Sequence, residues 1–404
     1  MTDWAARFSE YFIRHLAAEG QSPEQIVRWM WRPYRLEDLR IVGADRDQDF
    51  SRLAISPSDI REVLSRPPCT GVAANKDFFI RQKIAFVMLP GFTHETLRNL
   101  SFHEQIERPD SPHHVVMLKP GFKGEAPQEQ DYARGDGLKV LYVKYPRSNG
   151  ASRYVTGPMF EMLHQSPSLR RWVDEGYKLF FVGYSYGSVL GLELLADLNS
   201  GRHADEFILK NSVGLMCLCG DIGGSYLADD LLRPDAKLLN VHKLVDFCRR
   251  HPFVGKLLGL GTEQLLSDMA DGIRSLGHDE RQSRMRDYVP RLPAQLKYFS
   301  VAAVMPLGDY KRRWWQFNLD DYTMYRQALV SDPISVYNDG QVVLADNLLP
   351  AVAQIPPKNN IHLGAVRTHH WGVSYRTFNF GRNRFPRVAF YRALLQTVTE
   401  AIQG

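Results

Sequence analysis

Short apolar runs alternate with segments of helical periodicity over most of the chain from about Lys83 onward. The apolar runs predict strands at 84–89, 114–118, 138–143, 177–182, 213–219, 296–301, 334–337 and 360–363. The segments between them predict helices from about residue 94 and at 159–175, 188–198 and 387–401. Strands that alternate with helices are typical of a mostly parallel central sheet flanked by helices. We therefore expect an α/β fold.

Residues 1–75 follow a different pattern and predict an N-terminal helical extension of the main domain, residues 76–404. Trp4, Phe8 and Phe12 belong to an apolar stripe at helical spacing. Serines before prolines, at 22–23 and 56–57, predict the starts of two further helices, since serine caps a helix and proline suits its first position. We expect the extension to pack on the main domain.

Residues 230–292 interrupt the alternation of strands and helices. The segment is predicted to be helical and carries apolar patches, such as residues 253–260. A helical insertion at this point of the chain is in the right place for a cap or lid over an active site. Its apolar character favours an apolar ligand over a charged one.

The segment Gly183-Tyr184-Ser185-Tyr186-Gly187 lies between a predicted strand and a predicted helix. A Gly-x-Ser-x-Gly sequence in this context is typical of a nucleophile elbow, a tight turn that exposes the serine hydroxyl at the edge of the sheet. We predict Ser185 as a nucleophile and the Tyr186 N–H as an oxyanion donor. The Phe92 N–H, after Pro90-Gly91, is the expected second donor. The similar sequence at 120–122 is interpreted as an ordinary turn.

A serine nucleophile needs an imidazole to take its proton and a carboxylate to orient that imidazole. In a hydrolase sheet the acid and then the histidine follow the serine along the chain. We predict His370 as the base, with His369 and His362 as alternatives. We predict Asp339 as the acid because it follows the strand predicted at 334–337 and precedes a glycine. Asp221, which follows the strand predicted at 213–219, is the alternative.

Composition limits the partners and the setting of the chain. The net charge of +5 is mild and no run of Lys and Arg is long enough to suggest nucleic acid. No apolar run approaches the ~20 residues of a membrane span, and the N-terminus lacks the apolar core of a signal peptide, so we expect a cytoplasmic protein. The 4 cysteines lack zinc spacing and do not resemble a disulfide framework. Cys217 and Cys219 alternate along one predicted strand and are expected in the core on the same face.

From about residue 83 to its end, the chain resembles the α/β-hydrolases, and among them bacterial lipases and esterases. Besides the elbow, the resemblance lies in the sequences at 224–229, 271–276, 292–300 and 338–342. Lipases usually have Pro-His where this chain has Asp221-Ile222, and the first strand ends in Leu-Pro-Gly instead of His-Gly. Residues 1–75 lie outside the resemblance.

The resemblance implies a lipase- or esterase-like enzyme that cleaves carboxylic esters through an acyl-enzyme. With such an enzyme, the apolar insertion at 230–292 favours a medium or long acyl chain over a charged substrate. It implies a Ser-Asp-His triad, no cofactor and no metal, and a small-molecule or lipid ester as substrate, with transient contact to a lipid interface. One alternative is a thioesterase or acyltransferase acting on acyl-carrier or coenzyme A thioesters. Another is a hydrolase fold kept as a non-catalytic binding module.

Overall fold

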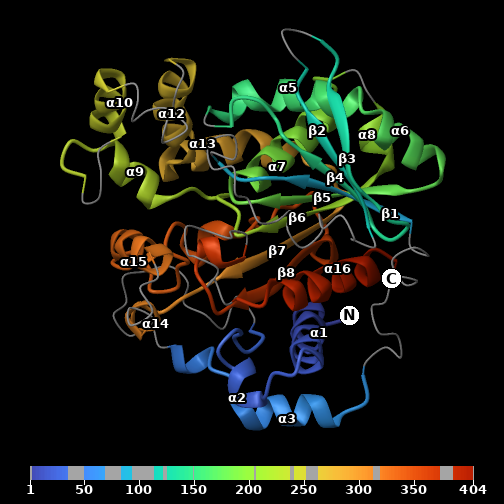
Figure 1. Ribbon diagram of the computed structural model, residues 1–404, viewed down its shortest axis with the longest axis vertical. Helices are drawn as coiled ribbons and strands as arrows, with labels where there is room; N and C mark the ends of the chain where they lie inside the picture. The colour runs from blue at the N-terminus through green and yellow to red at the C-terminus, as the bar shows by residue number, and fades with distance from the viewer. Residues whose placement is uncertain are drawn as a thin grey trace.

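The computed structural model describes residues 2–34, 50–68, 83–92, 113–121, 125–148, 150–203, 206–236, 241–251, 263–312, 319–373 and 385–403. Its centre is one eight-stranded sheet with the order β3-β2-β4-β1-β5-β6-β7-β8 (Figure 1). The strands are β1 Ile84–Leu89, β2 His114–Lys119, β3 Gln128–Arg134, β4 Lys139–Val143, β5 Lys178–Tyr184, β6 Ser212–Leu218, β7 Lys297–Ala303 and β8 Asn360–Val366. All neighbours are parallel except β2 and β3. The predicted α/β class is confirmed.

Two details of the sheet differ from the sequence prediction. The apolar run Ile334–Tyr337 follows helix α15 (Leu319–Ser331) and forms a turn instead of a strand, because the N–H groups of Ile334 and Ser335 donate locally to Ser331 O, both at 3.0 Å. Strand β3, which we did not predict, is the antiparallel edge of the sheet. Most of its residues are exposed, so it lacks the apolar run that reveals a buried strand.

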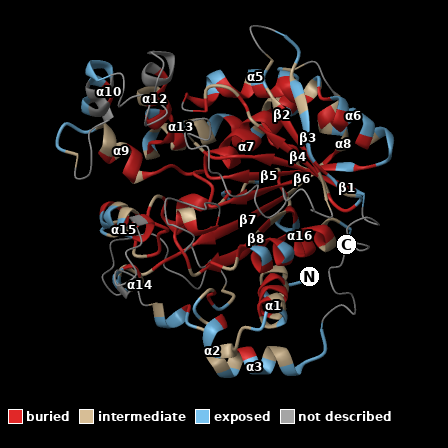
Figure 2. Ribbon diagram, viewed as in Figure 1, coloured by how far each residue is buried: buried red, intermediate tan, exposed pale blue. Residues whose placement is uncertain are grey.

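Helices cover both faces of the sheet (Figure 1). One face packs against α5 (Ser152–His164), α6 (Pro167–Asp174), α7 (Tyr186–Asn199) and α8 (Glu206–Asn211). The single helix predicted over residues 159–175 is two helices, because Ser166 caps α6 through Leu169 N and is followed by a proline. Apart from β3, the strands between the helical layers are almost wholly buried (Figure 2).

The opposite face is covered by α1 (Trp4–Ala18) and α16 (Arg387–Gln403), which lie side by side. Phe8 and Phe12 of α1 pack edge-on against Phe390 of α16, with ring centroids 5.9 Å apart in both pairs. The Tyr11 hydroxyl donates to Glu400 Oε2 at 2.6 Å. The first helix therefore completes the core on this face, and the expected boundary at residue 75 lies outside the described residues.

The remaining helices of the N-terminal segment begin where the sequence predicts. They are α2 (Pro23–Ile26) and α3 (Pro57–Ser65), each with a capping box at its serine. Beyond α2, Met30 forms an isolated antiparallel bridge to Val366 at the end of β8. This bridge joins the N-terminal segment to the edge strand that precedes the candidate base.

The insertion at 230–292 is mostly helical in its described parts, as predicted. The helices after β6 are α9 (Tyr226–Leu232), α10 (Val241–Arg250), α12 (Glu263–Leu276) and α13 (His278–Tyr288). The apolar patch at 253–260 lies outside the described residues. Glu193 of α7 joins this insertion to the elbow helix, because its carboxylate accepts from the buried Arg281 at 2.7 Å and from Arg284. Removing its partners would leave a buried charge uncompensated, which strongly destabilises a fold.

Further described elements follow β7 along the chain. They are α14 (Leu307–Arg312), α15, and the short 3-10 helices Leu344–Asn347, Pro357–Asn359 and His370–Val373. Within the described ranges, no helix is both long and apolar enough to cross a membrane.

Cys217 and Cys219 are both buried, as expected, but they do not share a face of the sheet. Cys217 belongs to the core beneath α5–α8, and Cys219 to the core beneath α1 and α16. The prediction was wrong because β6 ends at Leu218 and Cys219 adopts a φ of +47°, which breaks the alternation of the strand.

Candidate active site

Ser185 occupies a strained turn between the end of β5 and the start of α7. Its backbone has φ +53° and ψ −124°, a conformation that residues with a side chain rarely adopt. A Cβ on Gly183 would lie 2.5 Å from Ser188 Cα, and one on Gly187 would overlap the Leu89 carbonyl oxygen. Both glycines of the motif are therefore required by close approach of the backbone. The turn is fixed to β6 by the Ser185 N–H, which donates to Leu218 O at 2.9 Å.

Asp339 lies in a tight loop between α15 and β8 and is fully buried. One carboxylate oxygen, Oδ1, accepts from the N–H groups of Gln341 and Val342 at 2.9 and 2.8 Å. The other oxygen, Oδ2, lies 2.7 Å from Nδ1 of His370. Both oxygens thus have fixed partners, and the carboxylate determines which ring nitrogen of His370 holds a proton.

His370 opens the short helix His370–Val373 directly after β8. Its N–H donates to Asp339 O at 2.8 Å, and its carbonyl oxygen accepts from the Tyr184 hydroxyl at 3.0 Å. Burial lowers the pKa of the imidazole, but the neighbouring Asp339 and Asp221 carboxylates raise it by more, so its pKa lies above the ordinary value. Nε2 is buried and has no hydrogen-bond partner among the described residues. The ring therefore has its orienting side occupied and its other side available.

The alternative histidines have both ring nitrogens engaged elsewhere. His369 pairs with Asp321 at 2.9 Å through Nε2 and accepts from the Gly372 N–H through Nδ1. His362 lies between the Ser300 and Tyr34 hydroxyls, at 3.1 and 3.0 Å, and burial lowers its pKa to about 4. Neither residue lines the cavity that contains Ser185.

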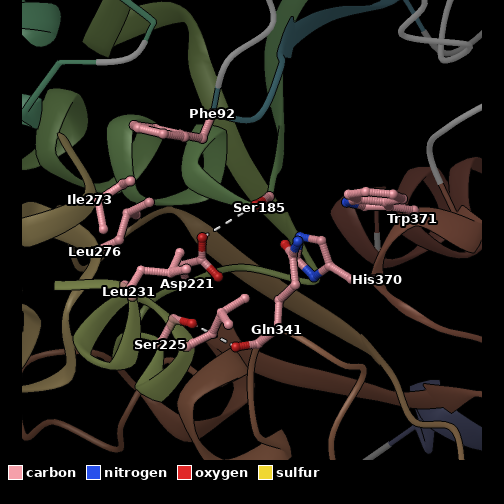
Figure 3. Close-up of a pocket in the computed structure, with 12 residues that line it drawn as sticks. Phe92, Ser185, Asp221, Ser225, Leu231, Ile273, Leu276, Gln341, His370 and Trp371 are labelled. Atoms are coloured by element: carbon pink, nitrogen blue, oxygen red, sulfur yellow. Dashed lines mark hydrogen bonds between the residues drawn. The ribbon is translucent and has the colours of Figure 1, made fainter. Parts of the chain in front are cut away.

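Asp221, the alternative acid, contacts the serine instead of the imidazole Nδ1. The Ser185 hydroxyl donates to Asp221 Oδ2 at 3.2 Å (Figure 3). Among the described residues no hydrogen bond joins Ser185 to His370, so the hydroxyl would have to rotate to reach Nε2. Burial raises the pKa of the Asp221 carboxyl to about 6. Its other oxygen, Oδ1, is buried without a hydrogen-bond partner among the described residues.

The loop after β1 lies against the elbow, where the predicted oxyanion donors belong. A Cβ on Gly91 would lie 3.2 Å from Ser185 Cβ, so the backbone before Phe92 passes close to the serine. The Tyr145 hydroxyl fixes this loop by donating to Pro90 O at 2.5 Å. The Phe92 ring packs edge-on against Tyr186, with centroids 5.6 Å apart. In the similar sequence at 120–122, Phe122 lies outside the described residues.

A cavity of about 170 Å³ opens between the elbow and the helical insertion (Figure 3). Its polar end holds Ser185, Asp221 and His370, and its apolar wall comes from α9 and α12. The lining comprises Phe92, Ser185, Asp221, Ser225, Leu227, Ala228, Leu231, Ile273, Leu276, Gln341, His370 and Trp371. An apolar part of a bound ligand would therefore lie next to the serine hydroxyl.

Cys219, Asp339 and His370 offer three possible metal-ligand atoms within 4.8 Å of one another. Burial raises the pKa of the Cys219 thiol well above its ordinary value, and the Asp339 and Asp221 carboxylates raise it further. Metals bind the thiolate, and Asp339 already has partners at both oxygens. These three residues are thus poorly suited to hold a metal.

No family model matches the chain, and no curated protein matches it. Among solved structures, it is similar to the metagenomic carboxyl esterase MGS0156, with 18% identity and a TM-score of 0.56 over 99% of this chain and 92% of that chain. The mature lipase BlEst2 of Bacillus licheniformis shows 15% identity and a TM-score of 0.39 over 78% of this chain and 92% of that one. The RedJ thioesterase of Streptomyces coelicolor shows 12% identity and a TM-score of 0.32, covering 83% and 91%.

The similarity to the carboxyl esterase, at a TM-score of 0.56, shows the α/β-hydrolase fold. The match to the carboxyl esterase covers 99% of the chain and so extends into residues 1–75, which we expected to lie outside the resemblance. The reason is visible in the fold, since α1 packs on α16 and belongs to the core of the domain.

Proposed function

We propose that this chain, which has the α/β-hydrolase fold, is a serine hydrolase that cleaves carboxylic esters through an acyl-enzyme. The observation that carries the proposal is the pairing of His370 Nδ1 with the buried Asp339 while Nε2 is left without a partner among the described residues, beside a strained serine. An imidazole held in this way keeps Nε2 free to accept a proton.

In the first half of the reaction, the Ser185 hydroxyl turns from Asp221 to Nε2 of His370. Its oxygen attacks the ester carbonyl while the proton passes to Nε2. Asp339 stays ionised and stabilises the imidazolium through Nδ1–H. The N–H groups of Phe92 and Tyr186 stabilise the negative oxygen of the tetrahedral intermediate.

In the second half, the intermediate expels the alcohol, which takes the proton from Nε2 as it leaves. A water molecule then attacks the acyl-enzyme, and His370 takes its proton in the same way. The ester of Ser185 breaks, the carboxylic acid is released, and the serine recovers its proton. Ser185 and His370, which exchange the proton in each step, both lie at the polar end of the cavity.

The cavity favours an acyl group of about six carbons. An apolar protein cavity of about 150 Å³ accommodates benzene, and the cavity beside Ser185 measures about 170 Å³. Leu231, Ile273 and Leu276 give it an apolar wall. Within the range of medium and long chains that the sequence favours, the structure therefore supports the shorter end.

The proposal is tested with p-nitrophenyl esters of increasing acyl length, comparing the wild type, Ser185→Ala and Ser188→Ala. Ser188 is a matched control because it is also buried and only three positions further along, yet its hydroxyl donates to Gly183 O. We expect the rate to peak near six carbons, to fall by at least about 10⁴-fold in Ser185→Ala, and to survive in Ser188→Ala.

Equal loss in both variants, or an active Ser185→Ala, would contradict the assignment of the nucleophile. If the wild type cleaves no oxygen ester, thioesters of the same acyl length test the thioesterase alternative. A chain that turns over neither, and whose Ser185 is not labelled by a fluorophosphonate, would be a non-catalytic binding module.

A further inference from the structure

The site contains a second buried carboxylate that the proposed triad does not use. Asp221 is 4% exposed and lies at the end of β6, opposite His370 across the cavity (Figure 3). One of its oxygens accepts the Ser185 hydroxyl at 3.2 Å. Its other oxygen and Nε2 of His370 are both buried and both lack a hydrogen-bond partner among the described residues. A buried polar atom without a partner costs free energy, so its position calls for a function.

The charges around Asp221 identify His370 as its electrostatic partner. His370 lowers the pKa of the Asp221 carboxyl, and the Asp221 carboxylate in turn raises the pKa of His370. Four other ionisable groups interact electrostatically with Asp221. Asp339 lies on the loop before β8, Arg281 on α13 and Asp346 on the 3-10 helix Leu344–Asn347. The Cys219 thiol lies on the same loop as Asp221. Among them Arg281 is already paired with Glu193.

We propose that Asp221 is a positioning residue for the proposed ester hydrolysis. Its carboxylate holds the Ser185 hydroxyl in the empty site and then stabilises the positive charge that forms on His370. This inference rests on the proposed function and adds to it a second negative group on the Nε2 side of the ring, whereas Asp339 serves the Nδ1 side.

Proton and charge remain balanced in this scheme. The Ser185 O–H bond breaks, the bond from its oxygen to the acyl carbon forms, and the proton moves to Nε2 of His370. Asp221 stays ionised throughout and gains no proton. An opposite charge within about 4–6 Å shifts a pKa by about one unit or more, so a carboxylate facing the ring favours the imidazolium formed in the transition state.

The test compares Asp221→Asn with Asp346→Asn. Asparagine keeps an oxygen that can accept from Ser185 but removes the charge. Asp346 is the matched control because it is also a buried carboxyl with a pKa raised to about 6, but its electrostatic partners are His278 and Asp221. The readout is the pH profile of kcat/KM for the best p-nitrophenyl ester. Loss of packing alone would lower the rate without moving the profile.

We expect Asp221→Asn to shift the acid limb of the profile about one unit lower and to reduce the plateau about tenfold. Asp346→Asn should leave the midpoint in place. If Asp221→Asn does not fold, as judged by its melting temperature, Asp221→Ala should give the same shift. An unmoved midpoint in the folded variant, or an equal shift in both variants, would overturn the inference.

Failure of this inference can be told apart from failure of the proposed function. If Ser185→Ala keeps its activity, the proposed function itself is wrong. If Ser185→Ala is inactive but the Asp221→Asn profile does not move, the serine mechanism stands and only the role of Asp221 is refuted.

Discussion

Replacing Asp339 by asparagine should prevent His370 from accepting a proton, although the new side chain has the same size. In the wild type, Oδ1 accepts from the N–H groups of Gln341 and Val342, and Oδ2 faces Nδ1 of His370. In the Asp339→Asn variant the amide oxygen must take the Oδ1 position, because only an oxygen can accept both N–H groups. The amide NH₂ group then donates to Nδ1 and forces the ring proton onto Nε2, the atom that must receive the proton of Ser185.

The size of the loss follows from these contacts. Turning the amide around would restore the productive tautomer but would leave two buried N–H groups facing an NH₂ group, at a cost of about 2 kcal/mol each. Their sum of about 4 kcal/mol corresponds to about 10³-fold in rate. The lost charge beside the imidazolium adds about another factor of ten, so kcat should fall by about 10⁴-fold, the loss seen when such a carboxylate becomes an amide.

The assay is turnover of a p-nitrophenyl ester by folded Asp339→Asn, with Asp321→Asn as the matched control. Asp321 is buried and pairs with His369 at 2.9 Å, so Asp321→Asn replaces a carboxylate by an amide beside the neighbouring histidine. The control should stay within about tenfold of the wild type. Activity of Asp339→Asn within tenfold of the wild type, or an equal loss in Asp321→Asn, would refute the reasoning.

The structure predicts three further outcomes. The acid limb of the wild-type pH profile should have its midpoint above 6.5, because the base must be neutral and the pKa of His370 is raised; a lower midpoint would contradict this assignment. Gly187→Ala should lose folded protein in thermal melts, because its Cβ would overlap Leu89 O, whereas Gly157→Ala, with nothing within 4 Å, should melt at least as high as the wild type. Glu193→Gln should lower the free energy of unfolding in urea by about 3 kcal/mol, since it leaves the buried cation of α13 without its counter-charge; an unchanged midpoint would show that this pair contributes nothing.

The strands and the elbow were predictable from the sequence because their causes are local. Runs of β-forming residues identified seven of the eight strands of the sheet, and the elbow glycines are required by contacts within a few residues and with the adjacent strand β1. The polar edge strand β3 was not predictable in this way. Its pairing with β2, and not its own pattern, makes it a strand.

Only the tertiary structure shows which of the candidate site residues lie in contact with one another. His369 and His370 are adjacent in the sequence, but the short helix after β8 turns one ring toward Asp321 and the other toward Asp339. Likewise, Asp221 and Asp339 were both predicted to follow strands. The run before Asp339 forms a turn, and only the packed loops show that Asp221 contacts the serine and Asp339 the imidazole. Residue type and order along the chain fix which chemistry is available, whereas hydrogen bonds between segments far apart in sequence decide which atom performs it.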